Sequence, residues 1–156
     1  MNLPIEFQQW SQCKSDNINS GGCGIYALAI YRYFQKHNMS LDRFRLVVFL
    51  RNYQKDMIFP IIENNNIVGN IPSHVVLMLN SMCYASEGVF EFYKYCKIQD
   101  EEYQRLPIVI DMIEEDLVKA INQPRSWNTT FDRTSGIETL SYMLNIDLSD
   151  IELWLD

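Results

Sequence analysis

The sequence predicts an α+β fold, in which a central helix with a cysteine at its N-terminus packs on a small antiparallel sheet and a helical C-terminal part follows. Three observations support this prediction. Residues 23–38 are apolar on nearly all sides, which is typical of a helix in the middle of a domain. Residues 74–87 form two apolar runs joined by the turn dipeptide Asn80-Ser81. Residues 100–156 carry apolar residues at helical spacing.

Length and composition are those of one globular domain. The chain has 156 residues, of which 13% are aromatic, whereas disordered chains are poor in aromatic residues. We expect a single domain over 1–156, with its core at about 12–98 and the helical acidic part at about 100–156. No apolar run approaches the roughly 20 residues of a membrane-spanning helix, and the N-terminus lacks the pattern of a secretory signal. These features predict a cytoplasmic protein without a membrane partner and with reduced cysteines.

The first half of the chain alternates between loops and apolar segments. Residues 1–22 are polar and end in a Gly-rich loop, and the helix that begins at Cys23 should end near His37. Residues 43–50 fit either a strand or a short helix, because periodicity alone does not separate the two. Residues 52–72 have the composition of a long loop.

The predicted sheet consists of short consecutive strands. His74–Leu79 is predicted as the first strand, Asn80-Ser81 as a tight turn, and Met82–Glu87 as the second strand. A third strand over 89–93 follows Gly88.

The C-terminal part is predicted to be helical. Four apolar residues recur at helical spacing before Pro124, namely Ile110, Ile113, Leu117 and Ile121. Ser135, three residues before Glu138, predicts a capping box at the start of another helix.

Charge is distributed unevenly along the chain, whose net charge is −7. Residues 1–99 carry nine Lys and Arg against seven Asp and Glu, whereas residues 100–156 carry four against thirteen. An acidic chain repels phosphate backbones, so we expect no nucleic-acid partner. The acidic segment 100–156 either binds a basic partner or keeps the surface of the protein solvated. The carboxylates of Asp111, Glu114, Glu115 and Asp116 are predicted on an outer helical face in solvent.

Metal chemistry is limited by the supply of ligands. The four cysteines form no C-x-x-C pair, and the chain has two histidines, His37 and His74. We therefore expect neither a metal nor a cofactor.

Cys23 stands where a Gly-rich loop enters the apolar helix. The free N–H groups and the positive end of the helix dipole at this position favour a thiolate. Gly22 and Gly24 leave room for a substrate carbonyl, and the first-turn N–H groups suit an oxyanion hole. Asn17 and Asn19, in the preceding loop, are further candidates for oxyanion donors.

A thiolate nucleophile needs a base. His37 lies at the far end of the same helix, roughly 20 Å away at 1.5 Å per residue, so we interpret it as a partner of the helix C-terminus. His74 begins an apolar strand, and a strand packed on the helix brings its imidazole toward Cys23. A two-residue turn sets His74 opposite Glu87, whereas a shift of one residue sets Ser86 there. We prefer Glu87 because it supplies a negative charge.

These residues resemble the papain-like cysteine hydrolase superfamily in its broad sense, which includes transglutaminase-like enzymes and small phage-encoded proteins. The resemblance covers roughly 12–90 and depends on Gly22-Cys23-Gly24 before an apolar helix and on the stretches from His74-Val75-Val76 and from Tyr84 to Val89. It implies that Cys23 is the nucleophile, His74 the base and Asn17 an oxyanion donor. The phage-encoded proteins commonly carry Asp where this chain has Ala85.

Two classes of function follow. The first is a cysteine hydrolase, a peptidase or amidase that acts on a protein or peptide through an acyl-thioester, with a transferase as its variant. The second is a catalytically inactive relative, such as a phage protein in the host cytoplasm, that inhibits a host protein through its acidic C-terminal part.

Overall fold

The computed structural model describes residues 2–10, 22–38, 44–51, 62–63, 66–67, 74–103, 105–110, 113–122 and 132–153. Residues 5–10 are helical. The elements that follow, in chain order, are α2 (Cys23–Lys36), β1 (Phe44–Arg51), β2 (Ile62–Glu63), β3 (Asn66–Ile67), β4 (His74–Leu79), β5 (Met82–Ala85), β6 (Gly88–Glu91), α3 (Phe92–Tyr103), β7 (Arg105–Ile110), α4 (Glu114–Ile121) and α5 (Arg133–Leu144). In this part of the chain, no helix is long and apolar enough to cross a membrane.

The main sheet has five antiparallel strands in the order β6-β5-β4-β1-β7. The predicted α+β class and antiparallel sheet are confirmed, and the ambiguous segment 43–50 contributes a strand, β1. The sheet is larger than the three consecutive strands that the sequence predicts, because β1 and β7 extend it beyond β4. The predicted long loop at 52–72 contains the short β2–β3 pair.

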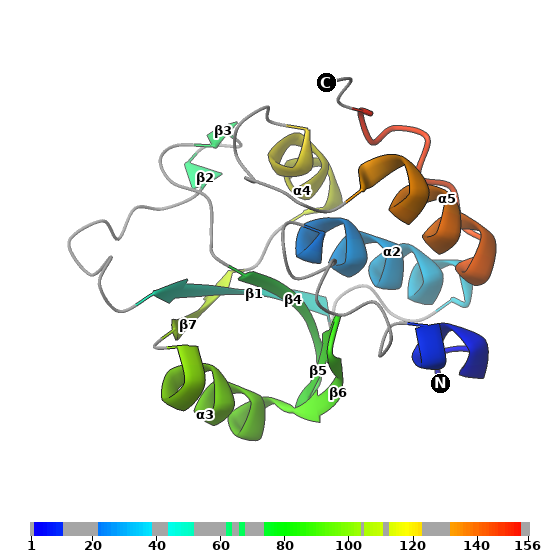
Figure 1. Ribbon diagram of the computed structural model, residues 1–156. Coiled ribbons are helices and arrows are strands. Elements are labelled where there is room, and N and C mark those ends of the chain that lie inside the picture. Colours follow the sequence, from blue (N-terminus) through cyan, green and yellow to red (C-terminus); the bar gives the residue numbers. More distant parts are fainter. Residues whose placement is uncertain are drawn as a thin grey trace.

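Helices cover both faces of the sheet (Figure 1). α2 packs on β4 and β5 from one side, and α4 and α5 pack on α2 in turn. α3 lies on the other side, against β5, β6 and β7. The core is correspondingly divided into a cluster around α2 and a cluster between the sheet and α3.

α2 is the buried central helix that its composition predicts. Ten of its residues are buried, namely Cys23, Gly24, Ile25, Tyr26, Ala27, Leu28, Ala29, Ile30, Tyr33 and Phe34. The helix ends where predicted, with His37 as its C-cap, and Asn38 follows with a positive φ of 57° that asparagine tolerates better than most residues.

The β4–β5 hairpin has the predicted register next to its turn, but the predicted second strand, 82–87, is wrong at its end because β5 stops at Ala85. Leu79 pairs with Met82 across a two-residue turn, in which Asn80 adopts a φ of 55°. Ala85 then pairs with Gly88, so a second two-residue turn, 86–87, connects β5 to β6.

The predicted third strand, 89–93, is partly wrong. β6 ends at Glu91, and Phe92 begins α3. The Glu91 carboxylate accepts hydrogen bonds from the backbone N–H groups of Tyr93 and Lys94, each at 3.2 Å. It thereby satisfies donors that the first turn of a helix leaves without an intrahelical partner, which favours helix after this residue.

Two predictions for the C-terminal part are also wrong. Ile110 does not belong to a helix, because it ends β7 and pairs with Leu46 of β1, so this part supplies a strand of the main sheet. Ser135 is not the N-cap of its helix. α5 begins at Arg133, and Asp132 is the N-cap, with its side chain accepting from the Ser135 N–H at 3.0 Å.

Candidate active site

Cys23 is the first residue of α2. Gly22 is the N-cap and offers no side-chain cap, while its carbonyl accepts from the Tyr26 N–H at 2.9 Å. The cysteine therefore lies at the positive end of a 14-residue helix, where thiolate is favoured over thiol. It is 2% exposed.

Cys23 and His74 lie toward the same end of α2 and β4. The two elements pack together and begin on the same side of the molecule (Figure 1). Phe34, near the end of α2, contacts Tyr84 with ring centroids 5.0 Å apart, and Tyr84 pairs with Leu77, in the second half of β4.

The imidazole of His74 belongs to a chain of polar contacts. His74 is 1% exposed, and its Nε2 lies 2.8 Å from the hydroxyl of Tyr95 on α3. That hydroxyl donates to Glu87, whose two carboxylate oxygens are both 3.0 Å away. Glu87 Oε1 is 3.8 Å from His74 Nε2, so a protonated imidazole forms an ion pair with it. Glu87 is thus beside His74, with a tyrosine hydroxyl between them, but it lies in the turn 86–87 after β5 and is not the strand partner of His74 that the sequence predicts.

The surroundings of Cys23 and His74 differ. Cys23 and Val75 belong to the core cluster around α2, whereas Phe49 and Tyr95, whose rings contact His74, belong to the cluster on the α3 side. Successive strand residues point to opposite faces. The sulfur and the imidazole therefore lie toward different faces of the sheet and can meet only beyond the first residue of β4. The Cys23–His74 pair stays a prediction.

The remaining predicted residues have varied positions. Ser86, the alternative to Glu87, is 1% exposed and donates to Glu87 Oε2 at 3.3 Å. His37 is exposed at the end of α2, where its ring contacts Tyr33 at 4.5 Å between centroids. Asn17 and Asn19 lie outside the residues that the structure describes.

Tyr95 is the site residue that the sequence interpretation misses. It is on α3, in a segment whose beginning is predicted as a strand. The spacing of Phe92, Tyr95 and Gln99 is helical, and Tyr95 and Gln99 are each 1% exposed. This periodicity predicts a buried helix face, although it does not predict the contact with His74.

Two other cysteines, Cys83 and Cys96, have raised pKa values. Cys83 is buried in the cluster on the α3 side, and burial raises its pKa to about 12. Burial and the charge of Glu91 also raise the pKa of Cys96. Both shifts lower the fraction of thiolate, which is the reactive form of cysteine.

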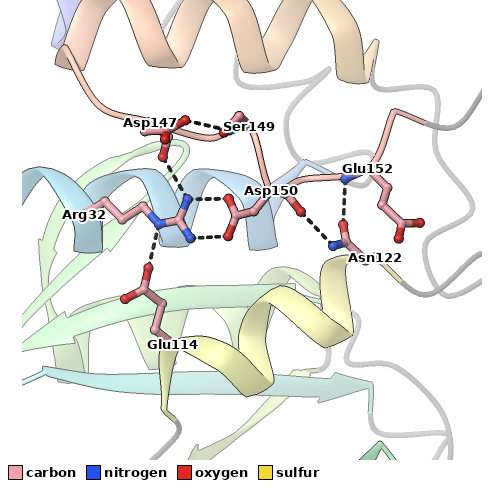
Figure 2. Close-up of polar contacts among 7 residues, drawn as sticks. All are labelled: Arg32, Glu114, Asn122, Asp147, Ser149, Asp150 and Glu152. Carbon is pink, nitrogen blue, oxygen red and sulfur yellow. Dashed lines mark hydrogen bonds and ion pairs between the residues drawn. The ribbon is translucent and has the colours of Figure 1, made fainter.

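A second polar cluster surrounds Arg32 of α2 (Figure 2). Its guanidinium donates to both carboxylate oxygens of Asp150 at 2.6 Å, to Glu114 Oε1 at 2.6 Å and to the Asp147 carbonyl at 2.8 Å. Asn122 links the same segments, since it donates to the Asp150 carbonyl and accepts from the Glu152 N–H. The cluster joins α2, α4 and residues 147–152.

The prediction of a solvated row of carboxylates on α4 is therefore wrong in part. Glu114 is paired with Arg32, and Asp116 is 6% exposed; Asp111 is not among the residues that the structure describes. Two surface depressions, of about 550 and 450 Å³, include Arg32 in their lining. Because carboxylates of this chain already bind the guanidinium, we interpret the cluster as a structural cross-link.

Comparisons with known proteins identify no family, so the function has to be inferred from the chemistry of the site. No family model matches the chain, and there is no significant match to a curated protein or to a solved structure. Within the described ranges, no group of three or more His, Cys, Asp and Glu side chains is arranged to hold a metal ion.

Proposed function

We propose that the protein is a cysteine hydrolase, a peptidase or amidase of papain-like type that uses Cys23 as nucleophile and His74 as base. The observation that supports this best is the series of polar contacts at His74, the first residue of β4. Tyr95 and Glu87 hold its imidazole there, on the side of the molecule where α2 also begins. A nucleophile, a base and a group that orients the base are the three parts that acyl transfer requires.

The reaction has two steps. In the first, Cys23 gives its proton to His74 and its sulfur attacks an amide or ester carbonyl, which forms a carbon–sulfur bond. The bond to the leaving group then breaks, and the imidazolium protonates that group. In the second step His74 takes a proton from water, the hydroxide attacks the thioester, and the carbon–sulfur bond breaks to release the acid and restore the cysteine.

Burial sets a condition on this mechanism. Cys23 is 2% exposed and His74 is 1% exposed. A substrate therefore has to displace part of the cover over the sulfur before it can react, as in enzymes whose sites open by local motion. We expect alkylation of Cys23 to approach a limiting rate as the reagent concentration rises.

Thiol reactivity tests the proposal with internal controls. We expect iodoacetamide to alkylate Cys23 below pH 7, whereas Cys83 and Cys96, whose pKa values are raised, stay unmodified under the same conditions. Peptide mapping by mass spectrometry assigns the site of alkylation. If Cys23 reacts no faster than Cys96, it is not an activated nucleophile.

Acylation tests the chemistry itself. With p-nitrophenyl acetate as the probe, we expect an acetyl group on Cys23 and release of nitrophenol. Cys23→Ala and His74→Ala should both abolish this reaction, whereas Cys96→Ala should leave it unchanged. Equal turnover in the wild type and in Cys23→Ala would exclude the mechanism.

A transferase is the variant in which an amine replaces water in the second step. Adding a primary amine at a constant concentration of p-nitrophenyl acetate distinguishes a transferase from a hydrolase. Formation of the amide at the expense of the acid indicates a transferase, and unchanged yield of the acid indicates a hydrolase.

The second candidate is a catalytically inactive papain-like phage protein that binds and inhibits a host protein. The deep burial of both Cys23 and His74 favours it. Its binding surface would be the acidic C-terminal part, in which α4 and α5 pack on α2 (Figure 1). If the wild type and Cys23→Ala inhibit growth of a bacterial host equally, binding rather than catalysis is the function.

A further inference from the structure

We infer that Tyr95 is a positioning residue of the proposed reaction: its hydroxyl couples Glu87 to His74 and fixes the imidazole with its proton on Nε2, which makes Nδ1 the base for Cys23. This inference rests on the proposed function. The observation behind it is the pair of contacts that Tyr95 makes, with His74 at 2.8 Å and with Glu87 at 3.0 Å.

The directions of the hydrogen bonds follow from the supply of protons. A phenol has one proton to donate, and an ionised carboxylate only accepts. The Tyr95 hydroxyl donates to Glu87 and must then accept at its contact with His74. The donor there is the N–H at Nε2. In a neutral imidazole the other nitrogen, Nδ1, then carries the lone pair and is the basic atom.

Glu87 does not reach the imidazole by itself. Its Oε1 is 3.8 Å from His74 Nε2, which is longer than a hydrogen bond but close enough for its charge to favour the imidazolium. Tyr95 fills this gap. Glu87 is 28% exposed at its side chain, whereas His74 is 1% exposed, so the chain connects a solvated charge to a buried ring.

Packing holds the hydroxyl in place. Tyr95 is 1% exposed, its ring stacks on Phe90 at 5.1 Å, and it meets Phe49 edge-on at 5.6 Å. Ala85 is buried in the same cluster. Because the neighbours fix the ring, Tyr95→Phe should remove the hydroxyl without moving the aromatic side chain.

A purely structural network is the competing explanation, since buried polar groups are generally hydrogen-bonded. Stability alone does not separate the two explanations, because both predict that Tyr95→Phe destabilises the fold. The protonation state of His74 and the pH profile of Cys23 do separate them.

The experiment compares Tyr95→Phe with Tyr84→Phe, which removes a phenol hydroxyl on β5, in the cluster around α2. We measure the rate of Cys23 alkylation by iodoacetamide against pH, and the state of the His74 ring by 15N NMR. We expect the wild-type ring to be protonated at Nε2. Tyr95→Phe should lose this single tautomer and slow alkylation below pH 7 by roughly 10-fold or more, as expected for loss of one charge-assisted hydrogen bond.

Glu87→Gln provides a second variant in case Tyr95→Phe does not fold. It keeps an acceptor for the Tyr95 hydroxyl but removes the charge, so we expect the Nε2 tautomer to persist while alkylation below pH 7 slows. Tyr84→Phe should match the wild type in both measurements.

The possible results are distinct. Tyr95→Phe that matches Tyr84→Phe in both measurements overturns the inference, as does a wild-type ring protonated at Nδ1. An unactivated Cys23 beside a ring protonated at Nε2 overturns the proposed function, and the positioning role with it, while the hydrogen-bond assignment holds.

Discussion

Arg32 shows how a charged residue is accommodated in an otherwise apolar helix. Its side chain is 16% exposed and forms a two-pronged pair with Asp150 and a second ion pair with Glu114. These hydrogen bonds raise the pKa of Arg32 and lower the pKa of Asp150. The planar guanidinium can satisfy both carboxylates and the Asp147 carbonyl at once, which a lysine cannot do.

Asp150→Asn should weaken this cross-link in a pH-dependent way. The Asp150 side chain is 48% exposed, so solvent screening limits the expected loss of unfolding free energy at pH 7 to less than about 1 kcal/mol. Because the pKa of Asp150 is lowered in the folded protein, its contribution is present above the unfolded pKa and is lost as pH falls through the folded pKa.

Urea unfolding at several pH values measures this effect. The difference between the wild type and Asp150→Asn should shrink toward zero at acidic pH. Asp100→Asn, which changes an exposed residue on α3, serves as the control. A difference that stays constant across this pH range would mean that the charge of Asp150 is not responsible.

Among the elements, α5 is the one whose beginning the sequence interpretation misplaces. The pattern of Ser135 and Glu138 predicts an N-cap at Ser135, whereas the structure assigns it to Asp132. Both residues are capable of capping a helix, and both are three residues before a potential partner. The choice depends on where the chain enters the helix, which the local sequence does not determine.

Two alanine variants test this assignment. Asp132→Ala should lower the unfolding free energy by about 1 kcal/mol, because the Ser135 N–H loses its acceptor. Ser135→Ala should change it by less than about 0.5 kcal/mol, because its side chain is exposed and its backbone N–H is kept. Thermal unfolding followed by circular dichroism measures both, and the reverse order of the two effects would contradict the assignment.

Local patterns explain why some elements are predictable. The apolar run after Cys23 determines α2, and the turn at Asn80-Ser81 determines the hairpin register. Glu87 lies near His74 because of the turn that follows β5, not because the two residues pair across strands. Each of these predictions depends on residues close together in the chain. Tyr95 reaches the same imidazole from α3, and that contact depends on how a helix packs on the sheet.

The whole molecule differs most from the prediction in its C-terminal part. The sequence predicts a single domain with its core at about 12–98 and a helical part at about 100–156, which its strongly acidic charge distinguishes from the rest. In the structure β7 pairs with β1 along six residues, and α4 and α5 cover α2. Net charge describes the solvent-facing side of these elements and carries no information on what their apolar side covers.

The fragment 1–103, which ends after α3, should therefore fail to fold. It lacks β7, which pairs with one edge of β1. It also lacks five side chains of the core around α2 that are each at most 3% exposed, namely Leu117, Ile121, Leu140, Leu144 and Leu148. At roughly 2 kcal/mol for each buried side chain, their loss amounts to about 10 kcal/mol, which is as large as the whole stability of a typical domain.

Urea titration of the fragment beside the full chain measures this directly. We expect no cooperative transition in the fragment and exposed apolar surface that binds a hydrophobic dye. The full chain should show one transition, because α4 and α5 pack on α2, which carries Cys23, and β7 pairs with β1, the strand beside β4 that carries His74. A cooperative transition in the fragment, with the Tyr95–His74 contact intact by NMR, would show instead that the acidic part is an addition to a core that folds without it.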